Sequence, residues 1–116
     1  MIDTGVKLVI ALGHLGDASA SKLLRSLLTH GDHRVVASAI EALDLIGAAD
    51  ARAAVKPLTA HKVPRIRANA LVFCRDDPSV DVEGTLKRML TAREFPQKLS
   101  ALWALSRLPH ERYGPM

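Results

Sequence analysis

The sequence predicts an all-α fold, an α-α superhelix (solenoid) of about three and a half repeats of 31 residues. Two observations support this prediction. The segment Arg34–Ile40 is followed 31 positions later by Arg65–Leu71, and a further 31 positions later by Pro96–Leu102. Within each period, apolar residues recur at the three- and four-residue spacing of amphipathic helices. A fixed period of this length is typical of stacked supersecondary units that share a continuous core.

The composition fits closely packed helices. Of the 116 residues, 48% are hydrophobic but only 3% are aromatic, and the net charge is +4. The single cysteine, Cys74, cannot form an internal disulfide, and no apolar run reaches the roughly 18 residues of a membrane span. The first residues also lack the pattern of a signal peptide. We therefore expect a cytoplasmic protein that does not enter a membrane.

The second helix of each repeat has the clearer pattern. Its apolar stripe covers Val35–Ile46, Ile66–Asp77 and Gln97–Leu108, and residues 4–16 supply the same stripe as a half repeat without a preceding helix. The middle of the stripe is small or apolar in every repeat. These second helices should therefore pack side by side at close distance.

The first helix of each repeat contributes a narrower apolar seam. Its equivalent positions are Ala20, Ala51 and Val82; Leu24, Val55 and Leu86; and Leu27, Leu58 and Met89. Pro57 falls inside the second of these helices and should kink or shorten it, because proline lacks the N–H of a helical hydrogen bond.

Turn signals separate the helices and bring the expected number to seven. Gly31–Asp32 lies between the two helices of one repeat, and Pro64 occupies the first turn of the next second helix. Gly47 and the segment Asp76–Ser79 follow second helices as stop signals.

Four positions define the helix faces that this register implies. We expect Ala39 and Ala70 to lie where helices approach most closely, so leucine at either position should overpack the core. Ser38 and Asn69 should lie on the open face, where the same change should have little effect.

These residues resemble HEAT-type repeats, in particular the short HEAT-like units of phycobilin lyases and many bacterial proteins. The matching segments are Ala11–Asp17 and its equivalent Ala42–Gly47, and Ile66–Ala70 is similar to the family's Val-Arg-x-x-Ala motif. The resemblance covers about residues 4–108. It implies that the second helices line a concave face and that this face binds a partner.

One departure from the family pattern concerns the arginine of this motif. Arg67 provides it in one repeat, but the equivalent residues are Lys98, Val36 and Gly5 in the others. The charge ladder that the family often forms between repeats is therefore incomplete in this chain.

We expect a single domain over residues 1–116, with a half repeat at 4–17 and full repeats at 18–48, 49–79 and 80–110. The N-terminal helix at residues 4–16 would leave the side chains of Val6 and Val9 partly uncovered, although terminal repeats need a polar outer face. Either the chain is a piece of a longer solenoid, or it self-associates through this N-terminal helix edge.

Positions not committed to packing form a column on the concave face: Ile10, Glu41, Val72 and Trp103. A tryptophan beside aliphatic residues suits a peptide-binding groove, because tryptophan and arginine dominate interface energies. The alternative is that Trp103 covers the end of the core beneath the tail His110–Tyr113.

Basic residues on the same helices suggest two kinds of partner. We nominate as partner-binding residues Arg34, Arg65, Arg67, Val72, Lys98 and Trp103. They favour another protein or a peptide of acidic character. The second hypothesis is that the partner is a nucleic acid, whose backbone contacts a stripe formed by Arg34, Arg65, Arg67 and Lys98. Several acidic residues lie nearby, however, and few aromatics are available to stack on bases.

No catalytic residue, metal site or cofactor is predicted. His30, His33 and His61 lie near helix–helix turns, but adjacent repeats are about 10 Å apart, as packed helices are, which is too far for a shared ion. Cys74 falls in the apolar stripe as a buried hydrophobe, and Asp77 should cap or end its helix. A third hypothesis, an accessory subunit of a lyase, rests on the resemblance alone.

Overall fold

The computed structural model describes residues 18–109, and all regular structure in that range is helical. The α-helices are α2 (Ala18–Ser26), α3 (His33–Leu45), α4 (Arg52–Val55), α5 (Pro64–Phe73), α6 (Val82–Leu90) and α7 (Phe95–Arg107). Three short 3-10 helices accompany them: η1 (Leu27–Thr29), η2 (Ala49–Ala51) and η3 (Lys56–Ala60). The predicted all-α repeat fold is confirmed for this part of the chain, and the half repeat expected at residues 4–16 lies outside it.

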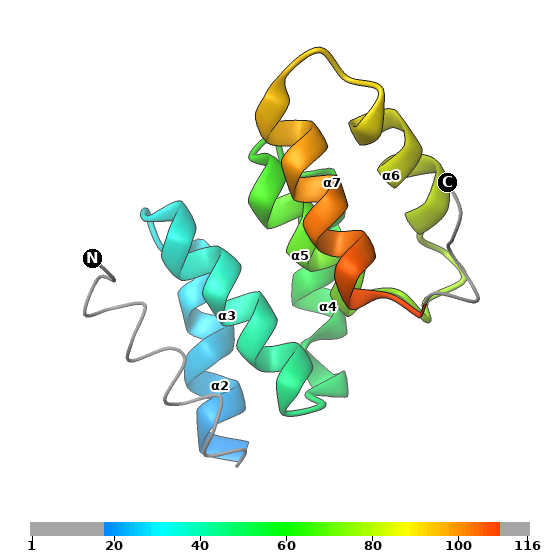
Figure 1. The fold of residues 1–116 in the computed structure, drawn as a ribbon. Helices are drawn as coiled ribbons and strands as arrows, with labels where there is room; N and C mark the ends of the chain where they lie inside the picture. Colours follow the sequence, from blue (N-terminus) through cyan, green and yellow to red (C-terminus); the bar gives the residue numbers. More distant parts are fainter. Residues whose placement is uncertain (1–17, 110–116) are drawn as a thin grey trace.

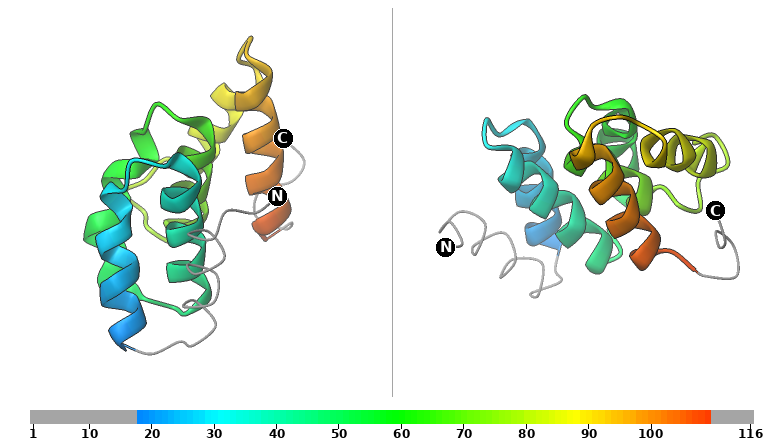
Figure 2. Two further views of the ribbon diagram at one scale, coloured as in Figure 1. Left: turned by 90° about the vertical axis from the view of Figure 1, so that its left-hand side faces the viewer. Right: turned by 45° about the horizontal axis from the view of Figure 1, so that its top comes forward.

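The helices form two layers (Figures 1 and 2). One layer consists of α3, α5 and α7, and α5 packs against both of its neighbours. The other consists of α2 with η1, of the series η2–α4–η3, and of α6, which pack behind α3, α5 and α7 respectively. Each outer segment and the inner helix that follows it make one helical pair. We refer to the surface of α3, α5 and α7 that faces away from the outer layer as the concave face.

The core follows the 31-residue register. Leu24, Val55 and Leu86 of the outer layer are fully buried, as are Ala39 and Ala70 of the inner layer. These residues belong to two adjoining clusters, one around α3 and α4 and the other between α5, α6 and α7. Most packing positions expected from the period are therefore buried, whereas Leu27, Leu58 and Phe73 are only partly buried against the core.

The helix ends also lie where the turn signals place them. The Asp32 carboxylate caps α3 by accepting the Arg34 N–H, and Pro64 occupies the first turn of α5. Gly47 follows α3 with a φ of 68°, a left-handed conformation that glycine adopts without strain. Pro57 lies at the start of η3, where the expected second outer helix breaks into η2, α4 and η3.

Two residues expected on the open face, Asn69 and Val72, are instead buried. Asn69 is only 2% exposed and Val72 only 6%. The reason is that α5 is the middle helix of the layer, so α3 and α7 screen it from both sides while α4 and η3 cover its back. Leucine at position 69 is therefore not expected to be silent, in contrast to leucine at the half-buried Ser38.

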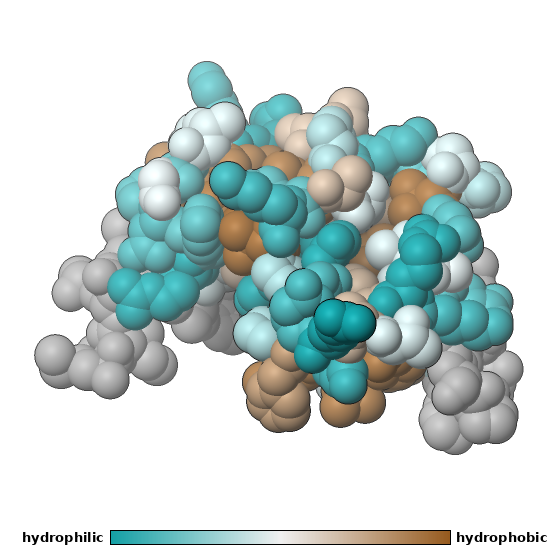
Figure 3. All heavy atoms as spheres, turned by 90° about the horizontal axis from the view of Figure 1, so that it is seen from above, coloured by the Kyte–Doolittle hydropathy of each residue, from teal (hydrophilic) through white to brown (hydrophobic). Residues whose placement is uncertain are grey.

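The surfaces between neighbouring inner helices were not part of the predicted stripe. Ile40 and Leu71 are fully buried there, whereas the equivalent Leu102 is 57% exposed on the free side of α7. Leu99, one turn earlier, is 55% exposed. Seen from above, the surface is largely polar, and apolar atoms show in a central recess and at one edge (Figure 3).

None of the helices in the described range is long and apolar enough to cross a bilayer.

Candidate functional site: a groove on the concave face

A groove of about 440 Å³ lies on the concave face between α3 and α7, with α5 beneath it. Its lining residues are Glu41, Asp44, Leu45, Asn69, Val72, Arg75, Trp103, Ser106, Arg107, Leu108 and Pro109. The structure therefore brings together three residues of the predicted column, Glu41, Val72 and Trp103. Ile10 lies outside the described residues.

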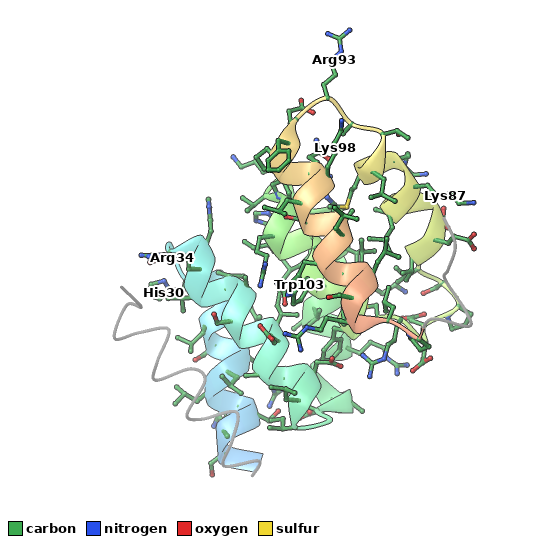
Figure 4. All side chains as sticks on the ribbon, in the orientation of Figure 1. His30, Arg34, Lys87, Arg93, Lys98 and Trp103 are labelled. Atoms are coloured by element: carbon green, nitrogen blue, oxygen red, sulfur yellow. The ribbon has the colours of Figure 1, made fainter. Side chains whose placement is uncertain are left out.

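Trp103 is half-buried in the gap between α3 and α7 (Figure 4). It packs against the second core cluster and also lines the groove. The Arg65 guanidinium lies 4.1 Å from the centroid of its ring, and the Arg107 guanidinium lies 5.5 Å from it. Such cation–π contacts hold the positive charges against the indole. The tail His110–Tyr113, which would cover Trp103 in the alternative interpretation, lies outside the described residues.

Two ion pairs connect different repeats around the groove. Glu41 Oε1 of α3 lies 3.6 Å from Arg107 Nη2 of α7, so this pair crosses the groove above α5. Asp44 Oδ1 accepts a hydrogen bond from Arg75 Nη1 at 2.8 Å. The second pair was not among the residues predicted from the sequence, although its two residues lie one period apart. Opposite charges at equivalent positions of adjacent repeats were the signal that would have identified it.

The floor of the groove contains an incompletely satisfied polar side chain. Asn69 Nδ2 donates to the Arg65 carbonyl at 3.0 Å, but Asn69 Oδ1 is buried without a hydrogen-bond donor. A buried acceptor that has lost its contact with water costs free energy until a donor reaches it.

Burial has the largest effect on the pKa of Arg65. The loss of water there lowers the pKa of the guanidinium, the Glu41 carboxylate opposes this effect, and the nearby Arg107 lowers the pKa further. Arg65 remains charged at neutral pH because an arginine pKa starts far above it. The guanidiniums of Arg65 and Arg107 thus both interact with the single carboxylate of Glu41.

The nominated basic residues do not form one continuous stripe. Arg34 pairs with Asp32 at 3.2 Å, at the first turn of α3 (Figure 4). Arg67 donates to Gln97 Oε1 at 3.0 Å between α5 and α7, and Lys98 lies on the α6 side of α7. Only Arg65 approaches the groove, through its contact with Trp103.

The histidine side chains take part in turns, and the cysteine side chain is part of the core. His30 Nδ1 and His61 Nδ1 accept the backbone N–H two residues later, at 2.9 and 3.0 Å, and the rings of His33 and His61 meet edge to face. Cys74 is buried, and burial, followed by the charge of Asp77, raises the pKa of its thiol. Within residues 18–109, no group of three or more His, Cys, Asp or Glu side chains could hold a metal ion.

Comparison with known proteins gives one family match. The sequence model described as HEAT repeats matches residues 6–74, which is more than half of the chain. No curated protein matches the sequence. The family match includes α3 and α5 of the groove and ends before α7.

Proposed function

The chain belongs to the HEAT-repeat family, and from this premise we propose that it is a non-catalytic interaction module, a scaffold that binds a partner protein on its concave face. HEAT repeats commonly serve as protein-interaction scaffolds. The observation that carries the proposal is the groove between α3 and α7, in which a half-buried tryptophan lies against two arginines.

The residue types in the groove suit a protein partner. Tryptophan and arginine contribute most to binding when a partner removes them from water. Leu45, which is 68% exposed, adds apolar surface beside polar groups that can orient a bound segment. The nominated basic residues form no continuous stripe, because Arg34 and Arg67 are paired away from the groove, so the structure supports the nucleic-acid hypothesis less well. The accessory-subunit hypothesis rests on the resemblance alone.

Site-specific photo-crosslinking tests the proposal. A photoreactive amino acid replaces Leu45 at the groove, and a matched control places it at Lys87 on α6, whose exposed side chain points away from the groove (Figure 4). We expect the Leu45 probe, but not the Lys87 probe, to capture a specific protein from a lysate of the source cell. Trp103→Ala should remove the captured band. A band that forms equally from Lys87, or that survives Trp103→Ala, would contradict binding in the groove.

A further inference from the structure

We propose that the groove binds an acidic peptide segment and that a ligand carboxylate takes the place of Glu41 on Arg107. This inference rests on the proposed function and specifies the chemistry of the partner. In the free protein, Glu41 then acts as an internal stand-in for the ligand.

The pairing of charges around the groove leaves Arg65 available to an anionic ligand. In the lining, Arg75 and Arg107 are matched by Asp44 and Glu41, and Arg65 adds a guanidinium above Trp103. Arg75 lies 2.8 Å from Asp44 and 4.0 Å from Asp76. Arg107 pairs with Glu41, and Arg65 forms no ion pair within the described part of the chain. A second carboxylate beside Arg65 and Arg107 would relieve the repulsion between these two cations.

The Glu41–Arg107 pair is easily exchanged. The two atoms are 3.6 Å apart, and the side chains are 36% and 53% exposed, respectively. Exposed ion pairs of this kind contribute little to stability. A carboxylate that approaches Arg107 along both of its N–H donors forms a stronger, bidentate pair.

The floor of the groove favours a peptide over a phosphate group. Asn69 Oδ1 is buried without a donor, and the main-chain N–H groups of a peptide can provide one. A fully ionised phosphate offers only acceptors. Leu45 and Leu108, which also line the groove, provide contacts for an apolar side chain next to the acidic one.

Binding of capped peptides to the full chain tests this inference. The probe is a fluorescein-labelled octapeptide that alternates leucine and glutamate, and the comparison peptide has glutamine at every glutamate position. Fluorescence anisotropy should show tighter binding of the glutamate peptide. Arg107→Gln should weaken its binding about tenfold, in line with the loss of a charged hydrogen bond. Glu41→Gln should tighten it about threefold, because the internal competitor is removed.

Two controls separate exchange at Arg107 from a general effect of charge. Arg93→Gln makes the same charge change on an exposed loop that points away from the groove (Figure 4), and it should change the affinity by less than about twofold. The gain from Glu41→Gln should become smaller in the Arg107→Gln background, because the guanidinium that pairs with Glu41 is no longer present to be released. If Arg107→Gln does not fold, Arg107→Lys keeps the charge without the planar fork and should weaken binding to a smaller extent.

Several results would overturn the inference. These are equal affinity for the two peptides, equal effects of Arg93→Gln and Arg107→Gln, additive effects in the double variant, and displacement of the peptide by inorganic phosphate at equal concentration. A Leu45 cross-link to a partner without discrimination between the peptides would overturn only the acidic-peptide inference. Absence of that cross-link would overturn the proposed function itself.

Discussion

At the scale of single residues, Trp103 belongs to two environments. One part of the indole packs against the core cluster of α5, α6 and α7, and another part lines the groove beneath Arg65. From the sequence alone these two environments were alternatives, a concave anchor or a cover of the core. A half-buried tryptophan that contacts the core contributes both to the stability of the fold and to the surface of the groove.

Trp103→Ala is therefore expected to lower the free energy of unfolding by about 1–3 kcal/mol, below the value for a fully buried tryptophan. Trp103→Leu should restore most of this loss, because it keeps apolar contact with the core. Chemical denaturation provides the measurement. The emission of Trp103, the only tryptophan in the chain, should be quenched by iodide in the native state. An unquenched, blue-shifted emission would return Trp103 entirely to the core.

His61 couples stability to pH. Its Nδ1 accepts the Val63 N–H, so the hydrogen bond requires a neutral ring. Loss of water lowers the pKa of His61 below 6.5, and the charges of His33, Lys62 and Arg67 lower it further. Because the folded protein disfavours the protonated ring, this stabilisation is present above pH 6.5 and is lost as the pH falls through the lowered pKa.

His61→Asn should reduce the decrease in melting temperature between pH about 7.5 and about 5, since asparagine can accept the same N–H without titrating in this range. Thermal unfolding followed by circular dichroism at both pH values checks this expectation. An unchanged pH dependence in the variant would assign the effect to other groups.

At the scale of the helices, the end of α3 depends on one backbone conformation. Gly47 has a φ of 68°, and the Ala48 N–H returns to the Leu43 carbonyl at 3.0 Å in a Schellman-type cap. A Cβ atom at Gly47 would meet no atom within 4 Å, and the same holds at Gly31, whose φ is not positive. The two glycines therefore differ in backbone conformation and not in available space.

Gly47→Ala is expected to cost about 1–2 kcal/mol, the penalty of a left-handed conformation for a residue with a Cβ. Gly31→Ala should stay within about 0.5 kcal/mol of the parent protein. Urea denaturation of the two variants checks the difference. Equal losses would mean that the cap does not hold the end of α3.

Local signals were sufficient to predict the order of the helices, the turns at Asp32, Gly47 and Pro64, and most packing positions, because these follow from periodicity and turn residues. Pro57, for instance, indicated the break between α4 and η3. The burial of Asn69 and Val72 could not be predicted in this way, since it depends on the middle place of α5 between two other helices. The contact of Arg65 with Trp103 likewise depends on side-chain conformations across two helices.

At the scale of the whole molecule, equivalent residues differ according to their place in the stack. Leu71 of α5 is fully buried by its neighbours, and Leu102 of α7, one period later, is 57% exposed. In a repeat protein each unit obtains its stability from the adjacent units. A leucine at the same position of the repeat therefore contributes more to the free energy of unfolding in the middle of the stack than at its edge.

Leu71→Ala is expected to cost about 2–5 kcal/mol, as for other buried leucines. Leu102→Ala should cost less than about 1 kcal/mol, because little apolar surface returns to water. Denaturant unfolding of both variants provides the comparison. A comparable loss from Leu102→Ala would show that another surface covers the free side of α7 in solution.

The Glu41–Arg107 contact also has a mechanical consequence. In a linear stack only adjacent units touch, so bending at one junction is independent of bending at the next. This contact joins α3 to α7 and skips the pair that contains α5. It therefore links the first and third helical pairs directly across the inside of the bend and favours the curved arrangement to a small extent. Salt screens an exposed pair of this kind. The arrangement of the three helical pairs should therefore become slightly flatter as ionic strength rises.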